Sequence, residues 1–167
     1  MRKVITLLFF VLLLGVIITG TFYFFYKNKQ EVLFPYDIPF KKEGSLDFYT
    51  KGHLHKIKRI IIELSETKTE ISLGLMYRHK MDKYDGMFFY LSRYLKTFFW
   101  MKNTYIPLDI IYVDDTFHIV SIQKNTKPLL EKGLPSYEKT MYVLEVNAGF
   151  CYMHNIKVGD SISYKRI

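Results

Sequence analysis

Phe99-Trp100-Met101-Lys102-Asn103-Thr104-Tyr105-Ile106-Pro107-Leu108-Asp109 is the stretch that says most about the fold. It places the only tryptophan of the chain beside a lysine, an amide and a carboxylate in apolar surroundings. Alternation along a strand from Phe98 to Asn103 would put Trp100 and Lys102 on the same face. A lysine in that position can lay its stem on the indole and hold its ammonium over the ring. The stretch therefore predicts a polar site within a β domain.

Runs of alternating and β-branched residues surround this stretch on both sides. Such runs, when separated by turn residues, predict strands. Many short strands with a few helices are typical of a compact barrel, so we expect a mostly β, β-barrel-like fold. The predicted strands are Leu46–Thr50, Ile57–Leu64, Met87–Leu91, Phe98–Asn103, Ile106–Val113, Phe117–Gln123, Tyr142–Val146 and Ser161–Lys165.

Two short α-helices are expected between these strands. Thr67-Lys68-Thr69-Glu70 matches a capping box, so a helix should begin there. Asn147 is a good N-cap for a second helix from Ala148 to His154, which Asn155 can end in the left-handed conformation. Lys124 to Lys139 is rich in proline and glycine and predicts a long surface loop.

The first 26 residues predict one N-terminal transmembrane helix. An uncharged apolar run extends from Val4 to Tyr26 between flanking lysines. These 23 residues would span roughly 34 Å as a helix, enough to cross a hydrocarbon core of about 30 Å. A cleaved signal peptide has a shorter apolar core, and a cut after Gly20 would place Ile18 where a small residue is required. We therefore expect an uncleaved signal anchor, with a cleaved and secreted form as the alternative.

Residues 27–44 contain Pro35 and Pro39 without helical or alternating periodicity, so they predict a linker. The remaining residues, 45–167, are enough for one domain with its own core. Cys151 is the only cysteine, which excludes an intramolecular disulfide and indicates a small buried apolar residue. We expect the domain to lie on the extracytoplasmic side of a membrane as part of the cell envelope.

The net charge of +8 and the basic run from Lys51 to Arg59 raise the question of nucleic-acid binding. Nucleic-acid binders combine such charge with a groove-entering or base-stacking module, which the sequence lacks, so we predict no nucleic-acid partner. His53 and His55 share a strand face, but the neighbouring cations oppose a divalent metal and no third ligand is evident. We predict neither a metal nor a cofactor.

Glu145 interrupts an otherwise apolar predicted strand. An unpaired charge there would cost several kcal/mol, so Glu145 should have a partner, for which Arg78 and Lys102 are candidates. Asp109 is a second carboxylate that Lys102 could bind. One hypothesis is an internal ion-pair network that stabilises the barrel.

The other hypothesis is a ligand pocket built from the same residues. An indole ring offers a stacking surface, amide side chains donate and accept hydrogen bonds, and a cation can bind an anionic group. An enzymatic version would use Asp109 and Glu145 as an acid and base pair. The candidate pocket residues are Arg78, Trp100, Lys102, Asn103, Asp109, Glu145 and Asn147.

Further motifs flank the tryptophan stretch: Gly74-Leu75-Met76-Tyr77-Arg78 before it, and Tyr142–Gly149 and Lys157–Asp160 after it. With these motifs in order, the chain resembles the family known as domain of unknown function 192 from about Lys56 to Tyr164. The resemblance implies a small, mostly β domain, often found behind a signal or membrane anchor in prokaryotic envelope proteins, and it implies no reaction. Many members carry a glycine where this chain has Asp114–Phe117, so we expect a looser hairpin there.

The sequence therefore predicts an uncharacterised, membrane-anchored envelope protein whose domain binds a small molecule, a glycan or a protein without turnover. The first alternative is a hydrolase or lyase acting on an envelope carbohydrate through Asp109 and Glu145. The second is a purely structural accessory protein. The hydrolase or lyase predicts that one of these carboxylates lines a cleft beside Lys102, whereas the structural protein predicts that both are sealed and paired.

Overall fold

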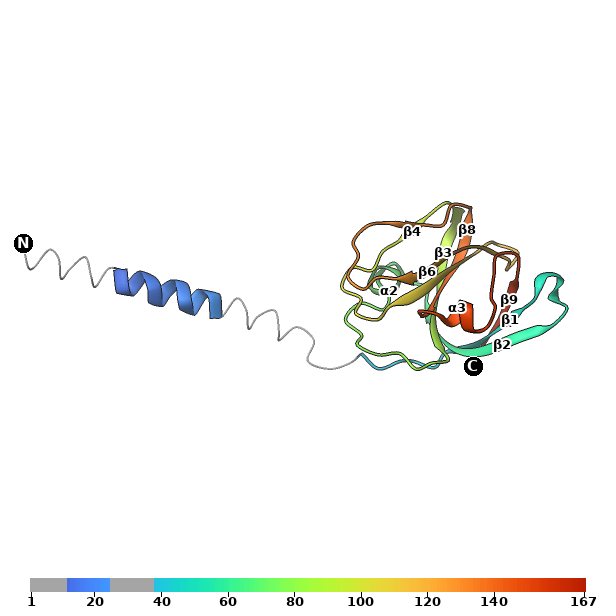
Figure 1. Cartoon of the computed structure of the whole chain (residues 1–167), viewed down its shortest axis with the longest axis horizontal. Helices are drawn as coiled ribbons and strands as arrows, with labels where there is room; N and C mark the ends of the chain where they lie inside the picture. Colours follow the sequence, from blue (N-terminus) through green and yellow to red (C-terminus); the bar gives the residue numbers. More distant parts are fainter. Residues whose placement is uncertain (1–11, 25–37) are drawn as a thin grey trace, which may run out of the picture. The chain divides into compact units, whose positions relative to one another are not determined.

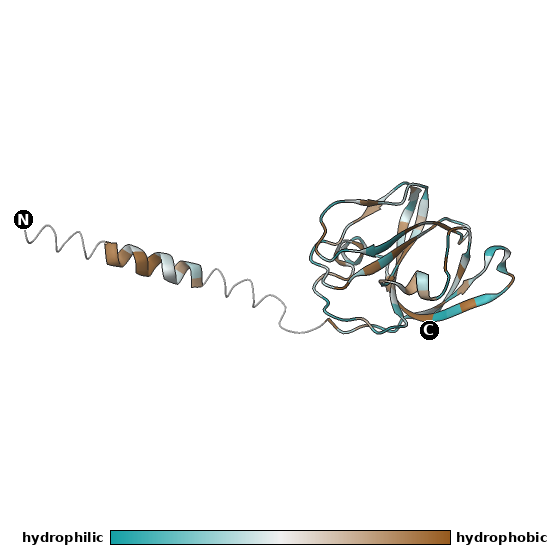
Figure 2. Ribbon diagram, viewed as in Figure 1, coloured by the Kyte–Doolittle hydropathy of each residue, from teal (hydrophilic) through white to brown (hydrophobic). Residues whose placement is uncertain are grey.

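The computed structural model describes residues 12–24 and 38–167. The chain divides into two compact units, residues 1–36 and 37–167. Residues 12–24 form an exposed helix, most of which is apolar (Figure 2). Among the described residues, no helix is both long and apolar enough to cross a membrane. The remainder of the predicted anchor, residues 4–11 and 25–26, lies outside the described residues, as does most of the predicted linker.

Residues 38–167 form a mostly β unit with three short helices (Figure 1). The helices are η1 (Lys51–His53), α2 (Lys68–Leu73) and α3 (Phe150–Met153). The strands are β1 (Gly44–Tyr49), β2 (Lys56–Ser65), β3 (Asp85–Leu95), β4 (Phe98–Phe99), β5 (Leu108–Val113), β6 (Ile119–Thr126), β7 (Leu134–Pro135), β8 (Thr140–Asn147) and β9 (Ser161–Arg166). The mostly β class predicted from the sequence is confirmed.

Seven of these strands make one sheet in the order β6-β5-β8-β3-β2-β1-β9, and β4 pairs with β7 in a second, two-stranded sheet. Neighbours in the large sheet are antiparallel except β2 and β3, which run parallel. A parallel pair needs a crossover connection, and here the crossover contains α2. The helix is thereby placed over one face of the sheet.

The start of α2 is held by the predicted capping box. The Thr67 hydroxyl accepts from the Glu70 amide, and the Glu70 carboxylate accepts from the Thr67 amide. Gly74 ends the helix at a φ of 48°, a conformation that glycine adopts without strain. A Cβ atom at Gly74 would lie 3.4 Å from the Phe89 ring, so the glycine also permits close packing on β3.

The large sheet is open, so the predicted closed barrel is wrong. The two edge strands, β6 and β9, do not share a ladder. A single bridge between His118 and Ser161 joins the ends of these edges in residues 38–167. Backbone hydrogen bonds around this bridge come from both sides, since the Ile119 amide donates to the Asp160 carbonyl, the Gly159 amide to the Ile119 carbonyl and the Ile162 amide to the Phe117 carbonyl. Strand count alone could not reveal whether the edges would pair along their length.

Each face of the large sheet packs against its own hydrophobic core, because successive side chains on a strand point to opposite faces. We name the two cores after neighbouring residues of β3. The Phe88 core contains Leu46, Phe48, Ile60, Ile62, Phe88, Ile111, Val113, Ile119, Leu144, Val146, Phe150, Cys151, Ile156 and Ile162. The Phe89 core contains Leu75, Met87, Phe89, Met101, Ile106, Leu108, Ile110, Tyr112 and Val143.

The strand predicted from Phe98 to Asn103 is wrong beyond Phe99. The chain turns there, because Met101 is fully buried in the Phe89 core and its amide donates to the Leu130 carbonyl. The Thr104 amide then donates to the Met101 carbonyl, and Asn103 adopts a φ of 52°. The alternation of residue types looked like a strand, but tertiary contacts of Met101 override it.

The second predicted helix is shorter than expected, and its predicted N-cap is wrong. Asn147 is the last residue of β8, and Gly149 occupies the N-cap of α3 with a φ of 84°. The Asn147 amide instead donates to the carbonyls of Met81 and Asp82. Asn155 does adopt the predicted left-handed conformation, with a φ of 53°.

Two connecting segments are better ordered than the sequence indicated. β6 continues to Thr126, whose hydroxyl donates to the Leu108 carbonyl, so the predicted loop begins later than Lys124. The turn after β5 was expected to be loose, but the Asp114 carboxylate accepts from the amides of Thr116 and His118. A carboxylate that binds its own turn takes the place of the missing glycine.

Candidate functional site

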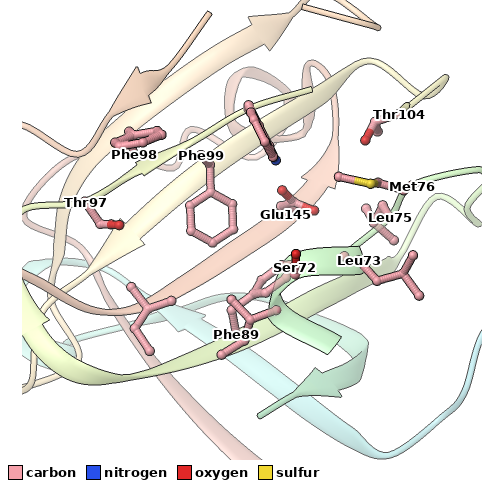
Figure 3. A pocket seen from close by; sticks show the side chains of 14 residues that line it. Ser72, Leu73, Leu75, Met76, Phe89, Thr97, Phe98, Phe99, Thr104 and Glu145 are labelled. Atoms are coloured by element: carbon pink, nitrogen blue, oxygen red, sulfur yellow. The ribbon is translucent and has the colours of Figure 1, made fainter. Parts of the chain in front are cut away.

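A pocket of about 160 Å³ opens on the Phe89 side of the large sheet (Figure 3). Its walls come from α2 and the segment after it, from β3, from residues 97–100 and from β8. Most of the lining is apolar, and Leu73, Leu75, Met76 and Phe89 contribute to it. An engineered apolar cavity of about 150 Å³ holds a benzene molecule, so this pocket can hold a group of similar size.

Among the described residues, Glu145 supplies the one carboxylate in the lining of this pocket. On β8 it lies between Met87 of β3 and Ile110 of β5, both of which belong to the Phe89 core. Glu145 is 5% exposed, and its carboxylate makes no hydrogen bond or ion pair with any other described residue. Burial raises the pKa of Glu145 to about 8. In the empty pocket at neutral pH, the group is therefore mostly protonated.

Aromatic rings form the side of the pocket nearest this carboxyl group. The Phe89 and Phe99 rings meet edge to face, with centroids 5.1 Å apart. Phe98 and Trp100 continue the wall toward solvent, and Trp100 is 42% exposed. The Phe99 ring and the Glu145 carboxylate are both among the side chains that line the pocket (Figure 3). The pocket thus combines several π faces with one acidic group.

A broader groove of about 640 Å³ adjoins the pocket and shares Ser72, Leu73, Met76 and Trp100 with it. Lys68 and Lys102 also line this groove. The Lys102 ammonium lies 5.3 Å from the centroid of the Trp100 ring, which confirms the predicted cation–π contact. The mouth of the site is therefore basic, while its interior is acidic and aromatic.

Arg78 does not bind Glu145, contrary to one of the two pairings expected from the sequence. Its guanidinium instead makes two hydrogen bonds of 2.7 and 2.8 Å to the carboxylate of Glu63, and both residues are buried. Glu63 also accepts from the Lys41 amide. The other expected partner, Lys102, lies over Trp100 at the groove and makes no ion pair with Glu145 in the described structure. The pair of Arg78 and Glu63 is thus the internal ion pair of this face of the sheet.

Asp109 lies on the opposite face of the large sheet from Glu145. Its Cα partner on β8 is Val146, a residue of the Phe88 core, and directly opposed residues point to the same face. The fully buried carboxylate accepts from the amides of Cys151 and Asn125, each at 2.9 Å. Burial, followed by the Asp109 charge, raises the pKa of the Cys151 thiol. Asp109 therefore fixes the start of α3 and does not line the pocket.

The two candidate asparagines lie outside the pocket lining. Asn103 donates through its amide to the Tyr77 hydroxyl at 2.8 Å, and its carbonyl accepts from the Tyr77 amide. Tyr77 lines the groove, so Asn103 supports one wall of it. Asn147 holds the loop that contains Met81 and Asp82.

Of the seven candidates, the structure brings Trp100, Lys102 and Glu145 to the pocket and its adjoining groove. Sequence reasoning missed the apolar lining contributed by Leu75, Met76 and Phe89. Leu75 and Met76 lie in the motif that begins at Gly74, and the positive φ of that glycine ends α2 just before them. The motif was a usable signal, but the cavity depends on tertiary packing.

Comparison with known proteins places the domain in a defined group. The profile of the DUF192 family, described as "Uncharacterized ACR", matches residues 50–164. A crystal structure of a "putative transcription regulator" from Sinorhizobium meliloti is 29% identical, with a TM-score of 0.70, over 77% of this chain and 98% of that chain. A protein of unknown function from Novosphingobium aromaticivorans is 34% identical, with a TM-score of 0.66, over 71% of this chain and 83% of that chain. No curated protein matches the chain.

Proposed function

Since the chain belongs to the DUF192 family, whose description gives no reaction, we propose a function from its own site: a domain that binds a small, largely apolar ligand without turnover. The observation that carries this proposal is the Glu145 carboxyl, buried and unpaired in the lining of an aromatic pocket. A carboxyl group that has little contact with water and no partner in the fold is stabilised by a ligand that hydrogen bonds to it or pairs with its charge.

The arrangement of the carboxylates favours binding over hydrolysis or elimination. An acid and base pair acts on one substrate, so both groups must reach the same cavity. Asp109 and Glu145 point to opposite faces of the sheet, and the Asp109 carboxylate is occupied by two backbone amides. An acid and base mechanism at the pocket would therefore have Glu145 but would lack Asp109.

The site also favours binding over a purely structural role. A structural role predicts that every buried carboxylate is paired, as Asp109 and Glu63 are. Glu145 departs from this pattern, as does the buried Asp85, but of these two carboxylates only Glu145 lines the pocket. Such an unsatisfied group in a native fold calls for an explanation, and a missing ligand provides one.

The N-terminal sequence supports a proposal for the cellular location of this domain. The uncharged run of residues 4–26 has the length and composition of a signal anchor, so we propose that the domain is tethered to a membrane and faces the extracytoplasmic side of the envelope. The test is membrane extraction: the anchored chain needs detergent for release, whereas release by carbonate or high salt would contradict the tether.

A thermal-shift screen of residues 38–167 tests the binding proposal. The Sinorhizobium meliloti structure consists almost entirely of the matching domain, which supports the use of this part alone. The screen uses small aromatic, aliphatic, sugar, amine and zwitterionic compounds. A ligand at about 100 times its dissociation constant adds about 2.7 kcal/mol to the stability of the folded state.

The expected result is a raised melting temperature with one chemical class, reduced in Trp100→Ala and Glu145→Gln proteins. Phe98→Ala is not a suitable control, because Phe98 lines the pocket. The control is Tyr152→Ala, which alters a residue on α3 that is 88% exposed, and it should keep the ligand-induced rise in melting temperature. A shift that survives both pocket substitutions, or no shift with any class, would contradict the proposal.

A further inference from the structure

The chemistry of the pocket narrows the class of ligand. Phe89, Phe98, Phe99 and Trp100 contribute aromatic rings to its wall, and Glu145 contributes the carboxylate. The faces of aromatic rings carry partial negative charge and attract cations, and a desolvated cation gains the most. The same site thus offers a cation both π faces and a carboxyl group that can ionise beside it, within a cavity able to hold a group the size of benzene.

Other ligand classes satisfy the pocket less well. A neutral apolar ligand would leave the Glu145 carboxyl without a hydrogen-bond partner. An anion would meet the Glu145 carboxylate and the negative ring faces. Calcium prefers six to eight oxygen ligands, whereas the described lining offers one carboxylate and the hydroxyls of Ser72, Thr97 and Thr104. An organic ammonium packs its alkyl groups against the rings while its positive charge pairs with the carboxylate, so it complements both the aromatic and the acidic part of the lining.

The mouth of the site adds a second requirement. Lys68 and Lys102 line the groove that continues from the pocket, and Lys102 is held over the outer part of the wall by Trp100. These ammonium groups would repel a ligand that carries positive charge alone. They would attract a ligand whose outer end is anionic. The order of charges from inside to outside is therefore negative and then positive, which a zwitterion complements.

We propose that the pocket binds a small zwitterion, with an alkylated ammonium group among the aromatic rings at Glu145 and an anionic group in the groove at Lys68 and Lys102. This inference rests on the proposed binding function and specifies its ligand. Glu145 and the rings select the ammonium end, and the two lysines select the outer end.

Trp100 provides a direct readout, because it is the only tryptophan and lines both the pocket and the groove. The experiment titrates residues 38–167 with glycine betaine and follows tryptophan fluorescence at pH 8.5, where more of Glu145 is ionised. The matched control is 3,3-dimethylbutanoate, which has the same shape and carboxylate but carbon in place of the charged nitrogen. Choline tests the inner end alone.

We expect glycine betaine to bind at least tenfold more tightly than 3,3-dimethylbutanoate and than choline. Glu145→Gln should reduce the affinity for glycine betaine at least tenfold and leave that for 3,3-dimethylbutanoate unchanged or improved. Lys102→Gln should reduce the preference for glycine betaine over choline. Lys165→Gln, on the edge strand β9, is the matched control. It should change neither the affinity for glycine betaine nor the preference for glycine betaine over choline.

The outcomes separate the two proposals. Equal or tighter binding of 3,3-dimethylbutanoate would overturn the ammonium assignment while the binding function stands. If choline binds as tightly as glycine betaine, the assignment of an anionic group to the groove is wrong and the pocket is a site for cations. If none of the three compounds changes the fluorescence or competes with a hit of the thermal-shift screen, the zwitterion proposal fails. If that screen also has no hit, the binding function fails with it.

Discussion

Asp109 and Glu145 are buried carboxylates on adjacent strands, but the structure treats them in opposite ways. On the Phe88 side, the Asp109 carboxylate accepts hydrogen bonds from the amides of Cys151 and Asn125. On the Phe89 side, Glu145 has no such donor within the described residues and lines a pocket. The difference teaches that burial alone does not identify a functional acid. What distinguishes Glu145 is that the fold provides a cavity where a partner would be.

Glu63 sharpens this comparison, because it lies on the same face as Glu145. Glu63 pairs across the sheet with Met87, which also pairs with Glu145. Arg78 satisfies Glu63 with two hydrogen bonds. A row of three side chains across the sheet thus holds a paired carboxylate at Glu63 and an unpaired one at Glu145. The Arg78 guanidinium pairs with Glu63 on β2, which is separated from Glu145 on β8 by strand β3.

The largest effect is expected from removing the satisfied carboxylate, with Asp109→Ala. The buried Cys151 amide and the part-buried Asn125 amide would lose their acceptor, at about 1 to 3 kcal/mol each, so we expect the free energy of unfolding to fall by about 4 kcal/mol. Urea denaturation measures this loss. Asp114→Ala, which removes an acceptor from an exposed turn, is a milder control. A loss below about 1 kcal/mol would show that the Asp109 hydrogen bonds do not stabilise the fold.

Arg78→Ala should have the next largest effect. The substitution leaves the Glu63 carboxylate buried and uncompensated, and breaking a buried pair in this way costs about 3 to 5 kcal/mol. We therefore expect the free energy of unfolding to fall by about 3 kcal/mol. Arg59→Ala removes an exposed partner of Asp47 and should cost under about 1 kcal/mol. Equal losses in the two variants would contradict the burial argument.

Glu145→Gln should have the opposite effect and raise the free energy of unfolding. The folded-state pKa of Glu145, about 8, lies above its ordinary value of 4.5, so the folded protein retains a proton that the unfolded chain releases. The stability of the natural protein therefore falls as the pH rises from about 4.5 to about 8, and the glutamine variant lacks this fall. We expect the variant to be more stable by about 2 to 3 kcal/mol at pH 7 and equally stable near pH 4.

Paired unfolding curves of both proteins between pH 4 and pH 9 measure this difference. Other titratable or charged groups on this side of the sheet are Tyr112, Glu63, Arg78 and the lysines of the groove, and they are common to both proteins. Their contributions cancel in the comparison unless they couple to Glu145. A difference that stays constant across this range would contradict a perturbed carboxyl at this position.

Trp100→Ala should have the smallest effect on stability, because the ring is 42% exposed. We expect a loss under about 1 kcal/mol, together with the loss of ligand binding. Its neighbour Met101 is the matched contrast, since that side chain is fully buried and Met101→Ala should cost about 2 to 5 kcal/mol. Similar losses at the two positions would show that Trp100 supports the fold and not the pocket.

Local sequence signals predicted much of this fold. The capping box at Thr67 and the left-handed Asn155 were correct because both depend on hydrogen bonds or backbone preferences within a few residues. The segment after Phe99 was wrong because Met101 is drawn into a core formed by distant strands. The closed barrel was wrong for the same reason, since pairing of the sheet edges is a long-range property.

The candidate site was predicted in part for comparable reasons. Glu145 was recognisable because a charge interrupts an apolar strand. The contact of Trp100 with Lys102 was predicted correctly, although the strand on which that prediction relied ends at Phe99. Partners were not recognisable, because Arg78 reaches Glu63 through a loop whose path the sequence does not specify. The separation of Asp109 from Glu145 depends on the register of β5 with β8, which strand prediction leaves open.

The central claim is that the fold leaves the Glu145 carboxyl buried, unpaired and open to a ligand. Carbon-13 NMR titration of the side-chain carboxyl groups, with the Glu145→Gln protein used to assign the signal, tests it most directly. The account predicts a pKa near 8 in the empty domain and a lower pKa with glycine betaine present, because a bound ammonium stabilises the carboxylate. A pKa close to 4.5 in the empty domain would show that the group is paired or solvated, and the account would be wrong.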